Sequence, residues 1–237
     1  TLTSSRRPKT RPASAEATLS GDEREMGVVL ADIGGGTADV AIYRQGQPWY
    51  SAVIPVGGSQ LTNDLAVALK TPMYLAEEMK IKWGSVMPEA IPADEEVVIP
   101  SFQGQTKYSL SRRILSEPLH DRMLEIIKMI VLTVRQSGLR ELPPGGIVFT
   151  GGGAEMTGLS QLVKKTLGGQ VRIAYPDGIA GLPAQLRKPA FSASVGLLLW
   201  GIKHQDETRS SLNGDRSQKG NKSWRWGLGR KPAAAAK

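Results

Sequence analysis

The polar residues Asp32, Thr37 and Asp39 flank three consecutive glycines, Gly34-Gly35-Gly36. Glycine can adopt positive φ angles and leaves backbone N–H groups unshielded, so successive N–H groups in such a turn can form a nest for an anion such as phosphate. Thr37 would add a hydroxyl donor, and the carboxylate of Asp32 is a suitable ligand for a hydrated Mg²⁺ that binds phosphate oxygens. The glycines alone are equally consistent with a hairpin that binds nothing, but their polar flanks favour a phosphate site.

A second glycine turn, Gly151-Gly152-Gly153-Ala154, follows the short apolar run 147–150. The first turn also lies between apolar runs, at 28–32 and 39–44, which read as strands. Each turn therefore closes a buried strand, and a helical insertion separates the two. This arrangement favours two parts of one nucleotide site over two unrelated hairpins.

The elements that must position these turns follow from periodicity and from helix-start and turn signals. A third strand is predicted at about 49–54, after a turn at Gly46-Gln47-Pro48. A helix at 59–69 follows, and Thr71 is predicted to cap a further helix that begins at Pro72 and ends near Trp83. The remaining predicted elements are strands at 96–99 and 106–110, a helix at 112–136, a helix ending near 167 and a last helix at 190–202. The helix at 112–136 is expected to bury an apolar stripe formed by Leu115, Leu119, Met123, Ile126, Ile127, Ile130 and Val134.

Composition excludes several classes of protein. The chain has 237 residues, no Cys and two His, so disulfides and thiolate metal sites are absent and a His-based metal site is not expected. Residues 1–12 carry a net charge of +4 and residues 210–237 carry +6, which leaves −2 of the total of +8 on the remainder. A nucleic-acid-binding fold would concentrate positive charge in the folded part, so we expect no nucleic-acid partner. No run of about 18 apolar residues is present, and a cytosolic protein is the default.

The two glycine turns resemble the second phosphate loop and the adenosine loop of the actin, Hsp70 and sugar-kinase superfamily. Over about residues 12–204 the chain resembles, more narrowly, the FtsA family of bacterial actin-like cell-division proteins. The segments that carry this resemblance are 32–40, 53–58, 61–66, 71–84, 150–154, 171–176, 178–182 and 194–201.

The resemblance implies an α/β fold: the ribonuclease-H-type second lobe of an actin-like protein, with a mixed sheet flanked by helices. The nucleotide-binding subdomain would comprise 13–69 and 146–204, and an inserted α+β subdomain would comprise 70–145. The flanking regions would be a disordered basic leader at 1–12, a linker at 205–221, a membrane-targeting segment at 222–231 and a tail at 232–237. The family's first lobe has no counterpart here, so we expect the chain to be a second half that binds ATP and Mg²⁺ weakly without turnover. No catalytic residue is assigned.

Further site residues come from the same resemblance. Glu77 and Lys80 would face the adenine and ribose of ATP; the alternative is a surface ion pair between two residues three apart on a helix. Arg112, Arg122 and Glu125 are candidates for contact with FtsZ, the family's tubulin-like partner. The whole protein would polymerise into filaments and tether FtsZ to the cytoplasmic side of the inner membrane. Two other functions stay open: an actin-like scaffold of another machine, such as type IV pilus assembly, and half of an Hsp70-like or sugar-kinase ATPase.

The tail segment carries two Trp and one Leu among cations. Trp224, Trp226 and Leu228 would enter a membrane interface, assisted by the neighbouring Lys and Arg residues. Gly227 and Gly229 each weaken a helix by about 1 kcal/mol relative to Ala, so we expect weak binding that depends on salt and on avidity. A basic tail without membrane affinity is the alternative.

Overall fold

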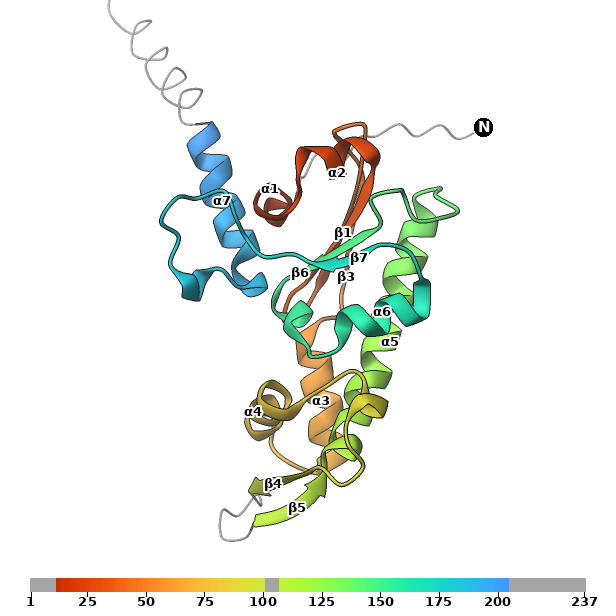
Figure 1. The fold of residues 1–237 in the computed structure, drawn as a ribbon, viewed down its shortest axis with the longest axis vertical. Coiled ribbons are helices and arrows are strands. Elements are labelled where there is room, and N and C mark those ends of the chain that lie inside the picture. The colour runs from red at the N-terminus through yellow and green to blue at the C-terminus, as the bar shows by residue number, and fades with distance from the viewer. Residues whose placement is uncertain (1–11, 101–106, 205–237) are drawn as a thin grey trace, which may run out of the picture. The chain divides into compact units, whose positions relative to one another are not determined.

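The computed structural model describes residues 12–100 and 107–204 (Figure 1). The predictions made for the leader, for the linker and for Trp224, Trp226 and Leu228 lie outside the described residues. The chain divides into two compact units, Thr1–Trp200 and Gly201–Lys237. The described residues of the second unit, 201–204, are helical up to Lys203 and form the end of the last helix. The site and the sheet belong to the first unit.

A mixed sheet of five strands lies at the centre of the first unit, in the order β3-β2-β1-β6-β7. The strands are β1 (Val28–Ile33), β2 (Ala38–Arg44), β3 (Gln47–Ile54), β6 (Ile147–Thr150) and β7 (Val171–Ile173). β1, β2 and β3 are antiparallel neighbours, whereas β6 lies parallel to both β1 and β7. The strand at 147–150 thus returns to the first sheet, as predicted, and places the two glycine turns at the ends of adjacent parallel strands.

The two faces of this sheet are buried by different helices. Because side chains alternate along a strand, Val29, Ala31 and Ile33 of β1 pack on one face with α5 and α6, while Val28 and Leu30 pack on the other face with α1. Both sets are fully buried. A continuous apolar run in β1 is therefore the mark of a strand covered on both sides.

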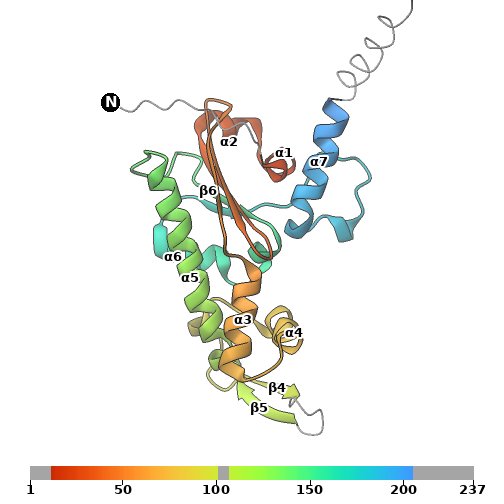
Figure 2. The same ribbon diagram turned by 180° about the vertical axis from the view of Figure 1, so that it is seen from behind.

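The helices follow the predicted order closely. They are α1 (Ala13–Thr18), α2 (Gly21–Met26), α3 (Gly58–Leu69), α4 (Met73–Trp83), α5 (Arg112–Gln136), α6 (Leu159–Leu167) and α7 (Ser192–Lys203). Between α4 and α5 lies a two-stranded sheet of β4 (Glu96–Pro100) and β5 (Lys107–Ser111). α3 lies beside the first half of α5, with α4, β4 and β5 at the same end of the first unit (Figures 1 and 2). The predicted apolar stripe of α5 is buried in full: Leu115, Leu119, Met123, Ile126, Ile127, Ile130 and Val134.

Two local predictions were wrong. The β2–β3 turn is formed by Gln45 and Gly46, which have φ of 52° and 72°, and not by Gly46-Gln47-Pro48. Positive φ at both positions gives the two-residue hairpin that fits the twist of adjacent strands. Pro48 is tolerated inside β3 because β3 is an edge strand. In α4, Pro72 is the N-cap with extended ψ of 149°, so the helix begins at Met73 and Thr71 does not cap it.

Candidate functional site

A cavity of about 710 Å³ lies between the two glycine turns and the helices α3 and α4. Its lining comes from segments far apart in the sequence: Gly34, Gly35, Gly58, Ser59, Leu61, Thr62, Met73, Tyr74, Glu77, Lys80, Ile81, Gly84, Gly152, Gly153, Glu155, Met156, Thr157 and Ala190. The fold thus brings the first turn, the second turn and the Glu77–Lys80 pair around one space, as the sequence predicted. Gly36 and Thr37 are exposed and do not line it.

The first turn is built differently from the expected positive-φ nest. None of Gly34, Gly35 and Gly36 has a positive φ. The carbonyl oxygens of Gly34 and Gly35 instead accept hydrogen bonds from the N–H groups of Gly58 (2.9 Å) and Ser59 (2.7 Å), the first two residues of α3. These bonds satisfy two of the donors that every helix leaves unpaired at its N-terminus.

Close packing explains why the residue before α3 is a glycine, but it does not explain Gly35 and Gly36. A Cβ on Gly57 would lie 2.8 Å from the carbonyl oxygen of Gly35, which is closer than a carbon atom can approach. Around Gly35 and Gly36 themselves a Cβ would meet nothing within 4 Å. Their N–H groups donate to no backbone carbonyl in the described part of the chain, so these two donors remain able to meet a phosphate.

The second turn needs glycine for both conformation and space. Gly151 has φ of 83°, and a Cβ there would collide with the carboxylate of Asp32 at the end of β1. A Cβ on Gly153 would collide with the side chain of Ile33. Gly152 differs, because a Cβ there would meet only Ala190 at 3.7 Å, an ordinary contact. Ala154 is buried, so it supports the turn from inside and does not line the cavity.

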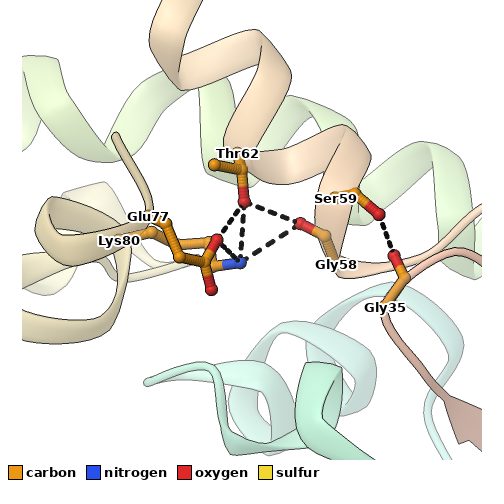
Figure 3. A network of polar contacts seen from close by, with 6 residues as sticks. All are labelled: Gly35, Gly58, Ser59, Thr62, Glu77 and Lys80. Carbon is orange, nitrogen blue, oxygen red and sulfur yellow. Dashed lines mark hydrogen bonds and ion pairs between the residues drawn. The ribbon is translucent and has the colours of Figure 1, made fainter. Parts of the chain in front are cut away.

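Glu77 and Lys80, one turn apart on α4, form an ion pair at the cavity wall. Lys80 Nζ lies 2.6 Å from Glu77 Oε2, 2.9 Å from Thr62 Oγ1 and 3.2 Å from the carbonyl oxygen of Gly58 (Figure 3). The Thr62 hydroxyl also donates to Glu77. Burial alone would raise the pKa of Glu77, but the hydrogen bonds from Lys80 and Thr62 outweigh it and lower that pKa. Unlike an isolated surface ion pair, the Glu77–Lys80 pair is joined to α3 by hydrogen bonds to Thr62 and Gly58.

Asp32 does not line this cavity. It is paired with Asp39 across β1 and β2, and both carboxylates line a second cavity of about 410 Å³ together with Ser14 and Ser51. Burial raises the pKa of Asp32, and the charge of Asp39 adds to the shift. Burial also raises the pKa of Asp39, against a hydrogen bond from Thr37. A nearby cation would stabilise the ionised form of both carboxylates.

The three candidate partner residues make contacts inside the protein. Arg112 donates to the carbonyl oxygen of Trp83 (2.8 Å) and pairs with Glu95 (2.7 Å). Arg122 donates to both carboxylate oxygens of Asp64, on α3, and to Glu125. Arg112 therefore holds parts of the inserted segment together, and Arg122 ties that segment to α3; their contact with FtsZ stays a prediction.

Several site residues were not singled out from the sequence. Thr62 and Ser59 of α3, Tyr74 and Ile81 of α4, and Glu155 after the second turn all line the cavity. A helical signal existed for α4, since Tyr74, Glu77 and Ile81 are spaced to share one face. Thr62 carried no such signal, because its partners lie 15 and 18 residues away in the sequence.

The arrangement of sheet, helices and cavity is that of an actin-like protein. The crystal structure of MreB 5 of Spiroplasma citri bound to AMPPNP superposes with a TM-score of 0.63 at 17% identity, over 84% of this chain and 60% of that one. PilM in the PilM–PilN type IV pilus biogenesis complex superposes with a TM-score of 0.57 at 19% identity, over 77% of this chain and 48% of that one. Identities this low show a common fold and nothing about a common partner.

The family follows from sequence comparison. The model of the family "Cell division protein FtsA" matches residues 29–196, and the chain belongs to this family. The cell division protein FtsA of Pseudomonas aeruginosa is 40% identical over 198 residues, which are 84% of this chain and 48% of that protein. The chain thus spans about half the length of the curated relatives it matches. Membership decides against the pilus-scaffold and the Hsp70 or sugar-kinase alternatives.

Proposed function

We propose that this chain is the ATP-binding half of an FtsA-type division protein that polymerises and tethers FtsZ to the inner membrane. The observation that carries the nucleotide part is the single cavity shared by the two glycine turns and the Glu77–Lys80 pair. The exposed N–H groups of Gly35 and Gly36 suit phosphate oxygens, which accept hydrogen bonds. The MreB 5 structure, which shares the fold, is bound to AMPPNP.

The carboxylates at the end of β1 and the start of β2, from Asp32 and Asp39, are suitable ligands for Mg²⁺. Mg²⁺ prefers oxygen ligands and keeps several waters, so one or two carboxylates are enough to hold it beside a phosphate. Asp32 would hold it through water, with Asp39 opposite, and these half-buried carboxylates would gain from its charge. Bound Mg²⁺ would neutralise the phosphate charge. In residues 12–100 and 107–204 no cluster of three or more His, Cys, Asp or Glu side chains is arranged to hold a metal ion.

The division-ring part of the proposal rests on family membership and on surface chemistry. In the proposed division into subdomains, 13–69 and 146–204 bind nucleotide and 70–145 supplies the FtsZ contact. Val98, Tyr108 and Ile114 in this inserted segment are apolar and exposed, with Val98 and Tyr108 on opposite faces of the β4–β5 pair. Among the described helices none has the length and hydropathy to span a bilayer. Membrane contact is assigned to the segment 222–231 because of the family resemblance and its Trp, Lys and Arg residues.

Two glycine variants with one matched control test nucleotide binding. Gly35→Val and Gly152→Val add side chains at the cavity where the structure has room, so both should fold and lose affinity for ATP. Gly21→Val, at an exposed position with open space around it, should leave affinity unchanged. Titration of each purified chain with Mg²⁺·ATP, beside its melting temperature, gives the answer. Unchanged affinity in both cavity variants would place the nucleotide elsewhere.

Recruitment to vesicles tests the tethering part. The chain is mixed with FtsZ and with vesicles of phosphatidylglycerol and phosphatidylethanolamine, and the vesicles are sedimented. FtsZ should sediment with vesicles only when the chain is present. If the chain binds ATP but FtsZ remains in the supernatant, the nucleotide part survives and the tethering part is wrong for these residues.

A further inference from the structure

The ammonium group of Lys80 uses all of its donors inside the protein. A lysine ammonium has three N–H donors. Here they meet Glu77 Oε2 at 2.6 Å, Thr62 Oγ1 at 2.9 Å and the carbonyl oxygen of Gly58 at 3.2 Å. The Lys80 side chain is only 10% exposed. Lys80 touches the cavity with its donors directed at acceptors of the protein, and its contact with adenine and ribose stays a prediction.

Glu77 is the member of the pair that remains able to bind. Its side chain is 45% exposed and lines the cavity. Oε2 accepts from both Lys80 and Thr62, whereas Oε1 accepts no hydrogen bond in the described part of the chain. Figure 3 shows this second oxygen directed away from the network. An ionised carboxylate oxygen is an acceptor only, so its partner must be a donor.

Thr62 joins the pair to α3. Its side chain is buried, accepts from Lys80 and donates to Glu77, and it also lies 3.1 Å from the carbonyl oxygen of Gly58. A hydroxyl has one proton, and the charged carboxylate oxygen is the closer acceptor, so the proton belongs to Glu77. Among the described residues, Thr62 is the one side chain that contacts both members of the pair.

The family resemblance already predicts that Glu77 faces the ribose. We propose that Thr62 is a positioning residue for this contact: its hydroxyl, with Lys80, fixes Oε2 of Glu77 and thereby directs Oε1 at a ribose hydroxyl of the bound nucleotide. The ribose is the part of ATP that fits. Phosphates are anionic acceptors that a carboxylate repels, and the glycine turn that suits them lies on another wall of the cavity. Vicinal hydroxyls are donors, and a charged acceptor makes a strong hydrogen bond with them. This inference rests on the proposed binding of ATP.

The experiment uses the 237-residue chain as wild type, Thr62→Val, Thr62→Ser, Glu77→Ala and the Thr62→Val/Glu77→Ala double variant. Dissociation constants are measured for ATP, 2′-deoxy-ATP and 3′-deoxy-ATP. Wild type should prefer ATP over at least one deoxy analogue by about tenfold, as expected for a hydrogen bond to a charged group. Thr62→Val should lose this preference, Thr62→Ser should keep it, and the double variant should match Glu77→Ala.

A preference retained by Thr62→Val, or additive losses in the double variant, would overturn the proposal. So would a wild type that binds ATP and both deoxy analogues equally. If Thr62→Val did not fold, Thr62→Ala makes the same comparison. A second readout needs no nucleotide: ¹³C NMR titration should show a higher pKa for the Glu77 carboxyl in Thr62→Val than in Thr62→Ser. If wild type binds no ATP, the proposed function is wrong. If the pKa of the Glu77 carboxyl is the same in Thr62→Val and Thr62→Ser, the positioning role of Thr62 is wrong, whatever the result with ATP.

Discussion

Arg122 of α5 donates two hydrogen bonds to Asp64 of α3, from Nε to Oδ2 at 2.5 Å and from Nη2 to Oδ1 at 3.1 Å. The two residues are 58 positions apart, and each side chain is about a quarter exposed. This two-point pairing fixes the spacing and rotation of the two helices. Arg122, a candidate for contact with FtsZ, therefore stabilises the packing of α5 against α3.

Breaking this pair should destabilise the protein modestly. Arg122→Ala and Asp64→Ala should each lower the free energy of unfolding by about 1 kcal/mol, since the pair is well oriented but partly solvated. Glu125→Ala, which removes the more exposed of the two acids on Arg122, should cost less than about 0.5 kcal/mol. Urea unfolding measures all three. If Arg122 also contacts FtsZ, Arg122→Ala should weaken FtsZ binding more than Asp64→Ala does; equal binding by the two variants would limit Arg122 to its structural role.

Two glycines of α7 should respond with opposite signs to replacement by Ala. A Cβ on Gly196 would collide with the carbonyl oxygen of Ala13 in α1, so Gly196→Ala should lower stability by about 1–3 kcal/mol. A Cβ on Gly201 would meet nothing within 4 Å, so Gly201→Ala should raise stability by up to about 1 kcal/mol through helix propensity. Thermal unfolding compares the two. A stabilising Gly196→Ala would contradict the close approach of these helices.

Asp32 should make stability depend on pH in a defined direction. Burial raises its pKa, with a further contribution from Asp39, so the folded state holds the proton more tightly than the unfolded state does. Such a carboxyl favours folding below its unfolded pKa and loses that contribution as pH rises through the folded pKa. Asp32→Asn should therefore be more stable than wild type at neutral pH, with a difference that shrinks as pH falls into the acid range. Urea unfolding across this range, without nucleotide or Mg²⁺, measures it, and a difference independent of pH would be inconsistent with a buried ionised carboxylate.

The segment 222–231 should bind membranes by electrostatics and aromatic side chains together. Cosedimentation of the chain with anionic vesicles should fall as salt rises, because each nearby cation contributes about 1 kcal/mol that salt screens. Replacing both Trp224 and Trp226 with Ala should also reduce it, and oligomerising the chain should increase it. Equal binding to neutral and anionic vesicles, or no binding even when oligomerised, would leave a basic tail without a membrane role.

Local patterns were sufficient for most elements of this fold. The 3.6-residue period of α5 gave both its ends and its buried stripe, and the apolar runs beside the glycine turns gave β1, β2 and β6. These predictions hold because helices and strands on a core must repeat their apolar residues at the period of the element. The second glycine turn was recognisable for a related reason, since only glycine fits where backbone meets backbone or where φ is positive, as at Gly151.

Tertiary structure decided which polar groups meet. The carbonyl oxygens of Gly34 and Gly35 bind the start of α3, so that turn has another conformation than the one expected from three glycines. The side chain of Asp32 lines a second cavity together with Ser14 of α1, and not the cavity that its neighbours Gly34 and Gly35 line. Thr62 and Asp64 lie within one turn of α3, yet one holds Glu77 and the other holds Arg122. A hydrogen bond depends on distance and direction between atoms, and for partners on different elements these quantities exist only once the helices have packed.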